Sequence, residues 1–323
     1  MEYLKEDIIQ ARKILFTGLD TAGKTSIILA LKKEFSKIAV ISPTQGAQRR
    51  IFDFLNIEIS EWDLGGQKSY RISYLKNPNK YFDNTEIAIF VIDIQNELRI
   101  PEAISYLKDV ITQFHKLKIS PPLNIFFHKY DPNFPENIRK NWDDLISNLK
   151  KRVKSETQYR KLSFYNTSVY NLPSILFTMS EILLKLYPKS QLISKTISEF
   201  CLKINCNSMV ILDQNSIILG SYFKDEKSEE LINKVLPYFI KLDNEFQDHI
   251  KMGNDLKDQI IFQRTNYYFV FKKFSLKSIP FSWYLILLKK GVYFFEDTFE
   301  PLIKMLELVI YKEVLNNPYA FNQ

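Results

Sequence analysis

The sequence is poor in several kinds of residue, and each shortage excludes a class of protein. It has 2 cysteines, Cys201 and Cys206, in an apolar pattern without a second pair, so neither a disulfide framework nor a zinc site is indicated. No apolar run reaches the roughly 18 residues of a transmembrane helix. Residues 1–6 form no secretory signal, Glu2 stands where N-myristoylation requires glycine, and residues 320–323 carry no prenylation box. We therefore expect a cytoplasmic protein whose contact with a membrane surface would need a partner.

Glycine is scarce as well, and its placement is informative. The chain of 323 residues has 8 glycines, where average usage of about 7% would give roughly 23. Five of the 8 lie in the first 66 residues: Gly18, Gly23, Gly46, Gly65 and Gly66. Glycine adopts positive φ easily and lets the backbone approach a ligand closely. The bias therefore predicts a binding site in the N-terminal part of the chain.

Charge and hydropathy are those of an ordinary globular protein. The chain is 46% hydrophobic and 25% charged, with a net charge of +7. This charge permits contact with anionic lipid or nucleic acid but argues for neither, and we expect no nucleic-acid partner. The length favours two domains.

A phosphate-binding loop is predicted at Gly18-Leu-Asp-Thr-Ala-Gly-Lys-Thr25, which follows an apolar run and precedes a helical pattern. Backbone N–H groups and a helix N-terminus would bind the anion there. Lys24 would reach the β- and γ-phosphates, and the Thr25 hydroxyl would hold Mg²⁺. A tight turn with a surface lysine is the weaker alternative. The residues expected to contact the nucleotide here are Gly18, Asp20, Thr21, Ala22, Gly23, Lys24, Thr25 and Ser26.

A second motif, Asp63-Leu-Gly-Gly-Gln67, follows a predicted core strand. Asp63 could hold Mg²⁺, and Gly66 could give its N–H to a γ-phosphate. Gln67 then lies where its amide could orient the attacking water, which makes it the candidate catalytic residue. Alone, this pattern is a weak signal that a surface turn would also explain. Downstream of a phosphate loop, it indicates nucleotide hydrolysis.

Thr44 lies on a loop between the first helix and the next strands. Its hydroxyl could complete the Mg²⁺ shell only while a γ-phosphate is present, so that hydrolysis would release the loop. The alternative is a structural threonine in a Pro-Thr turn.

A base-recognition motif is predicted at His128-Lys-Tyr-Asp131. The Asp131 carboxylate could accept from the N1–H and the 2-amino group of guanine, a donor pair that adenine lacks on that edge. The aliphatic stem of Lys129 can cover the base plane. At the end of the sixth strand, a backbone N–H of Ser168 could reach the guanine O6.

Apolar strands alternate with helices in the first half, which predicts an α/β fold with a mostly parallel six-stranded sheet between helices. The expected strands are 12–17, 50–54, 57–62, 87–92, 123–127 and 162–167. The expected helices are 24–35, 101–117, 135–153 and 174–186. Residues 68–86 are polar and aromatic, with a loop expected at 77–79. Ligands bind such sheets at the carboxyl ends of the strands, and the motifs at 18–25, 63–67 and 128–131 each follow such an end.

The break at residues 187–191 suggests a domain boundary, giving domains 1–187 and 188–323. The second half is expected to be α+β, in the order helix, two strands, helix, three strands, helix. No catalytic constellation is visible there, because His249 stands alone and the acidic residues follow solvated helix faces.

The ordered motifs resemble those of the small Ras-like GTPases over residues 1 to about 187. The amino-acid sequences of residues 18–25 and 62–67 resemble those of Arf-type GTPases. His128, in place of the usual Asn of the base motif, and residues 84–93 are similar to Rag GTPases. The second half is similar in element order to the roadblock (longin-related) domain that Rag GTPases carry.

This resemblance implies a Rag-like GTP/GDP switch with Mg²⁺ that signals as a homo- or heterodimer through its C-terminal domain and works with activating and exchange proteins. Ser42 stands where Gα-type proteins carry their own arginine, so hydrolysis should be slow without an activating protein. Two alternatives stay open: an Arf-like membrane-trafficking GTPase, and a nucleotide-binding scaffold with little turnover. A P-loop kinase is disfavoured because we find no acceptor site or lid.

Overall fold

The computed structural model describes residues 11–55, 57–187, 190–251, 259–264, 266–276, 279–291 and 299–316. The expectations about Glu2 and residues 320–323 lie outside these residues, and so does the side chain of His249. The chain divides into two compact units, residues 1–30 with 34–174, and residues 31–33 with 175–323.

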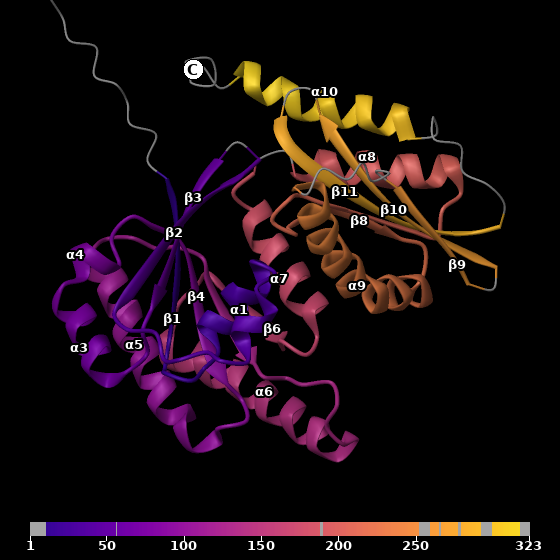
Figure 1. Ribbon diagram of the computed structural model, residues 1–323. Coiled ribbons are helices and arrows are strands. Elements are labelled where there is room, and N and C mark those ends of the chain that lie inside the picture. Colours follow the sequence, from indigo (N-terminus) through magenta and orange to yellow (C-terminus); the bar gives the residue numbers. More distant parts are fainter. Residues whose placement is uncertain are drawn as a thin grey trace, which may run out of the picture. The chain divides into compact units, whose positions relative to one another are not determined.

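The first unit contains a six-stranded sheet in the order β2-β3-β1-β4-β5-β6 (Figure 1). Its strands are β1 (Arg12–Gly18), β2 (Ala47–Phe54), β3 (Ile57–Leu64), β4 (Thr85–Asp93), β5 (Leu123–His128) and β6 (Leu162–Thr167). All neighbours pair in parallel except β2, an edge strand that runs antiparallel to β3. The predicted mostly parallel six-stranded sheet is confirmed.

The helices of this unit correct two expectations. They are α1 (Lys24–Leu31), α2 (Phe35–Ile38), α3 (Lys68–Lys76), α4 (Pro78–Tyr81), η1 (Glu97–Arg99), α5 (Ile100–Lys116) and α6 (Glu136–Thr157). The predicted helix 24–35 was too long: α1 ends at Leu31, because Lys33 adopts a left-handed φ of 61° that a helix cannot continue through. The loop expected at 77–79 was also wrong, since Pro78 begins α4, where its missing N–H costs nothing.

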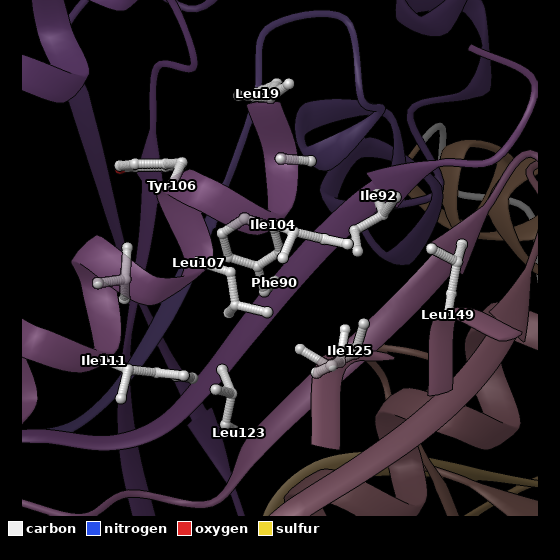
Figure 2. Packing of buried hydrophobic residues seen from close by; sticks show 14 of the residues in the cluster. Leu19, Phe90, Ile92, Ile104, Tyr106, Leu107, Ile111, Leu123, Ile125 and Leu149 are labelled. Carbon is white, nitrogen blue, oxygen red and sulfur yellow. The ribbon is translucent and has the colours of Figure 1, made fainter. Parts of the chain in front are cut away.

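The core of the first unit lies between the sheet and two long helices. On α5 the buried residues recur at helical spacing, among them Ile104, Leu107 and Ile111. Figure 2 shows Ile104 and Leu107 beside Phe90 of β4 and Ile111 beside Leu123 of β5, and Leu149 of α6 belongs to the same cluster. This packing fixes the parallel strands, so the loops at their carboxyl ends gather at one edge of the sheet.

The second unit is built on a five-stranded antiparallel sheet in the order β8-β7-β11-β10-β9. Its elements are α7 (Leu172–Leu184), α8 (Ser190–Ile204), β7 (Ser208–Leu212), β8 (Ile218–Phe223), α9 (Glu226–Lys251), β9 (Gln259–Arg264), β10 (Tyr267–Leu276), β11 (Ile279–Lys290) and α10 (Glu300–Asn316). After α7, the predicted order of helices and strands is confirmed. Figure 1 shows α8 and α10 on one side of this sheet and α9 on the other. The ring centroids of Phe200 on α8 and Phe299, just before α10, lie 6.4 Å apart. This contact links the two helices.

The division into compact units falls before α7 ends, earlier than the boundary expected at residue 187. Within the second unit, the Phe177 ring of α7 lies 6.0 Å from that of Phe223 on β8. Ser180 Oγ also accepts a 2.7 Å hydrogen bond from the backbone N–H of Ile218. The domain boundary at 187 therefore stays a prediction. Within the described parts of the chain, we find no helix with the length and apolarity to cross a bilayer.

Candidate functional site

A cavity of about 590 Å³ opens at the carboxyl ends of the parallel strands in the first unit. Most of the residues predicted from the sequence line it: Asp20, Thr21, Gly23, Lys24, Thr25, Ser26, Thr44, Gly66, Gln67, His128, Lys129 and Asp131. The remaining four, Gly18, Ala22, Asp63 and Ser168, do not line the cavity. Gly18, Asp63 and Ser168 each hydrogen-bond to a lining residue. The loop motifs of the sequence thus meet in one place.

The phosphate loop places a buried lysine at the start of α1. The Lys24 side chain is 5% exposed, and its Nζ donates to the carbonyl oxygens of Gly18 at 3.2 Å and Leu19 at 2.7 Å. Burial lowers the pKa of Lys24 to about 8, against the opposing charges of Asp63 and Asp20. At neutral pH the ammonium is charged, at the N-terminus of a helix that favours anions.

Gly23 is required by its close approach to His128. Gly23 has a φ of 96°, and an added Cβ would lie 2.4 Å from Cδ2 of the His128 ring. The ring is 1% exposed, with Nδ1 2.9 Å from Thr167 Oγ1. Burial, and then the charge of Lys129, lowers the pKa of His128 to about 3. The His128 side chain is therefore neutral and packs against the phosphate loop at Gly23.

The loop after β3 packs directly on the phosphate loop. An added Cβ on Gly66 would lie 2.1 Å from the backbone nitrogen of Asp20, so only glycine fits. The next residue, Gln67, caps α3 without a side-chain hydrogen bond to it and lines the cavity. Gln67 thus lines the same cavity as the phosphate loop, and its action on an attacking water stays a prediction.

Three oxygen-bearing side chains meet where the phosphate loop, the Thr44 loop and the end of β3 come together. The Thr25 Oγ1 lies 2.6 Å from Thr44 Oγ1 and 2.6 Å from Asp63 Oδ2, and Thr44 Oγ1 donates to Asp63 Oδ2 at 3.3 Å. Asp63 is 4% exposed, and its Oδ1 is buried without a hydrogen-bond partner among the described residues. Two hydroxyls and a carboxylate with an unpaired oxygen fit Mg²⁺, which prefers oxygen ligands.

At the other end of the cavity, Asp131 is held by two donors. It is 8% exposed, and its Oδ1 accepts from Ser168 Oγ while its Oδ2 accepts from Gln95 Nε2 at 2.8 Å. Lys129 pairs with Asp93 at 2.6 Å. The backbone N–H of Ser168 donates to Ser174 Oγ at 3.1 Å, so its contact with a guanine O6 stays a prediction.

Several lining residues escaped the sequence analysis. Gln95 follows the end of β4 by two residues, and Phe134, Val169 and Tyr170 follow β5 and β6. The rule that ligands bind at strand ends would have indicated Gln95, because 87–92 was recognised as a strand. The two aromatic residues carry no such signal.

A row of four charges runs from the phosphate loop to α3. Arg99 Nη2 lies 2.8 Å from Asp20 Oδ1 and 3.1 Å from Glu102 Oε2, and Glu102 also pairs with the buried Arg71. Burial alone would raise the pKa values of Asp20 and Glu102, but their hydrogen bonds to the arginines outweigh it and hold both below their ordinary values.

Comparison with known proteins relates this chain to a family of G proteins. The Gtr1/RagA G protein conserved region matches residues 13–239. ADP-ribosylation factor-like protein 3 of Chlamydomonas reinhardtii is 38% identical over 119 residues, which are 37% of this chain and 63% of that protein. ADP-ribosylation factor-like protein alp41 of Schizosaccharomyces pombe is 37% identical over 101 residues, 31% of this chain and 51% of that protein. The chain thus spans between half and two thirds of these curated relatives.

A solved structure is similar as well. The Arl6 BBS3 small GTPase from Trypanosoma brucei, with bound nucleotide analogue GppNp, is 19% identical, with a TM-score of 0.41, over 55% of this chain and 97% of that chain.

Proposed function

The chain belongs to the Gtr1/RagA family of G proteins, and from this premise we propose that it is a GTP/GDP-dependent switch that hydrolyses GTP with Mg²⁺. The observation that carries the proposal is the meeting of Thr25, Thr44 and Asp63. They come from the phosphate loop, a surface loop and a strand end, and a bound cation and phosphate would hold all three together.

Each group at the site has a task in this proposal. The charged Lys24 and the N-terminus of α1 bind the β- and γ-phosphates. Thr25, Thr44 and Asp63 hold Mg²⁺, which when bound neutralises charge on the phosphates. Gln67 orients the attacking water beside the γ-phosphate. Asp131 accepts hydrogen bonds from the guanine edge, with the stem of Lys129 over the base.

The Thr44 loop is the movable part. The Thr44 hydroxyl lies 2.6 Å from Thr25 and 3.3 Å from Asp63, and the Gly46 carbonyl accepts a 2.9 Å hydrogen bond from the backbone N–H of Gly65. With a γ-phosphate and Mg²⁺ bound, the Thr44 hydroxyl would serve as a metal ligand and would hold the loop closed. Hydrolysis removes the γ-phosphate and releases the loop, which changes the surface that a partner contacts.

Hydrolysis by the chain alone should be slow. Ser42 lines the cavity two residues before Thr44 and brings no positive charge to the transferring phosphoryl group. We propose that an activating protein supplies an arginine in trans, which accelerates such reactions by on the order of 10³–10⁵.

A Rag-like role is better supported than an Arf-like trafficking role. The match to the Gtr1/RagA region extends to residue 239, well into the second unit, whereas the Arf-like relatives match 31 to 37% of the chain. The second unit fits a roadblock-like domain in its element order. We propose that it forms a homo- or heterodimer and that any membrane contact, like exchange and activation, depends on partner proteins.

A scaffold with little turnover is the competing function, and Gln67→Leu separates the two. In single-turnover hydrolysis of GTP, with and without cell extract as a source of activating protein, the variant should be slower by at least about tenfold, roughly 1.4 kcal/mol in the barrier. GTP affinity should stay unchanged, because the amide acts on the water rather than on the nucleotide.

The matched control is Gln191→Leu, which removes an exposed amide on α8 and should hydrolyse GTP as the wild type does. Equal rates for the wild type and Gln67→Leu, even with extract, would favour the scaffold.

A further inference from the structure

Gln95 makes an unusual pair of contacts at the base end of the cavity. Its Nε2 donates to the backbone carbonyl of Lys129 at 2.9 Å and to Asp131 Oδ2 at 2.8 Å. Because both neighbours are acceptors, the amide nitrogen must face them, and both of its hydrogens are used. One side chain thus ties the carboxylate to the backbone of its own loop.

The rest of Gln95 and the loop around it are fixed too. Its backbone N–H donates to Asp93 Oδ1 at 3.0 Å, while the other oxygen of Asp93 pairs with Lys129 Nζ at 2.6 Å. Lys129 has a left-handed φ of 65°, a conformation that needs support in a residue with a side chain. The hydrogen bond from Gln95 to the Lys129 carbonyl supplies that support.

The Asp131 carboxylate has hydrogen-bond acceptor positions left for a ligand. A carboxylate has about four lone-pair positions. The Ser168 hydroxyl uses one on Oδ1, and Gln95 uses one on Oδ2. One position is left on each oxygen, as the two neighbouring N–H donors of a guanine edge require.

We propose that Gln95 is a positioning residue for base recognition: it holds the Asp131 carboxylate so that both oxygens face the guanine edge together. The inference rests on the proposed guanine-nucleotide function and adds a residue to it. Without the amide, Oδ2 is free to turn away, and the contact with the guanine 2-amino group is lost first.

The test compares GDP with inosine diphosphate, which lacks the 2-amino group, on the full chain with Mg²⁺. Gln95→Met keeps the volume of the side chain and removes its donors. We expect the wild type to prefer GDP by on the order of tenfold or more, as a hydrogen bond to a charged group contributes. In Gln95→Met that preference should fall by about fivefold or more, mainly through weaker GDP binding.

Asn96→Ala is the matched control. It removes the side-chain amide of the next residue, which has no hydrogen bond to Asp131 in the part of the chain that the structure describes. It should keep the wild-type preference. A merely structural loss would weaken both nucleotides equally and leave the ratio unchanged, which would overturn the inference. If the wild type itself binds neither nucleotide, the proposed function fails instead.

Discussion

At the scale of single residues, burial determines the charge of His128 by lowering its pKa to about 3. The sequence placed His128 in the base-recognition motif but did not indicate how deeply its ring would be buried. The ring is 1% exposed and packs against Gly23, and this burial favours its neutral form. Gln95, in contrast, belongs to no motif: its place after β4 would have put it at the strand ends, but only the fold shows its contact with Asp131.

The lowered pKa of His128 predicts a pH dependence of stability. The folded value is about 3 against an ordinary 6.5, so between these values the unfolded chain binds a proton that the folded chain does not. Stability should therefore fall as pH drops below 6.5, with His128 contributing up to about 1.4 kcal/mol per pH unit. His128→Asn should remove this contribution, measured by urea unfolding from about pH 7 to about pH 5.

His115→Asn is the control, because His115 is exposed on α5 and its loss should leave the slope as in the wild type. If His128→Asn and the wild type lose stability in parallel, the ring is protonated in the folded protein and the account of a neutral His128 is wrong.

At the scale of elements, the parallel strands were predictable and α3 was not. The parallel strands are continuously apolar because both of their faces are buried. Such runs can be recognised from the sequence alone. On α3 the buried residues are Arg71 and Tyr74, so the helix has no apolar stripe to recognise. Arg71 is buried because Glu102 pairs with it, a tertiary contact that local sequence cannot indicate.

The charged row Asp20–Arg99–Glu102–Arg71 should restrain α3 relative to the phosphate loop. Glu102→Gln removes the charge that joins the two arginines. Because Arg99 and Glu102 are partly exposed, solvent screening limits the loss of stability to about 1 kcal/mol. The α3 amides should exchange hydrogen faster at neutral pH. The folded pKa of Glu102 lies below 4.5, so the contribution is present above pH 4.5 and is lost as pH falls through the folded value.

Glu156→Gln breaks the pairings of Glu156 with Arg152 on α6 and Lys108 on α5, neither of which involves α3, and should leave exchange in α3 unchanged. Equal exchange in α3 for the wild type and Glu102→Gln would contradict a restraining role for the row.

At the scale of the whole molecule, the second unit carries the proposal of dimerisation. Its strand β9 lies at the sheet edge and exposes Ile261 and Phe262, each 51% accessible. Edge strands with exposed apolar side chains favour pairing with another chain. Element order predicted this domain, but the sequence did not indicate which edge would be left open, since that depends on strand order.

We expect light scattering of the full chain at micromolar concentration to give twice the 38.2 kDa of one chain, or the same assembly with a related chain. Ile261→Lys should weaken the dimer, because charge on an edge strand opposes pairing. Leu98→Lys, at a residue of the first unit that is 94% exposed, is the control and should leave the mass unchanged. A monomer in every condition would contradict dimerisation.

The cavity is proposed to bind guanine nucleotides, and the relative affinities for guanine and adenine nucleotides decide whether it does. After removal of bound nucleotide, the affinities for GTP, GDP, ATP and ADP are measured with and without Mg²⁺. We expect a preference for guanine over adenine of at least about 100-fold, roughly 2.7 kcal/mol, with Mg²⁺ strengthening GTP binding through Thr25, Thr44 and Asp63. ATP binding as tightly as GTP would contradict it.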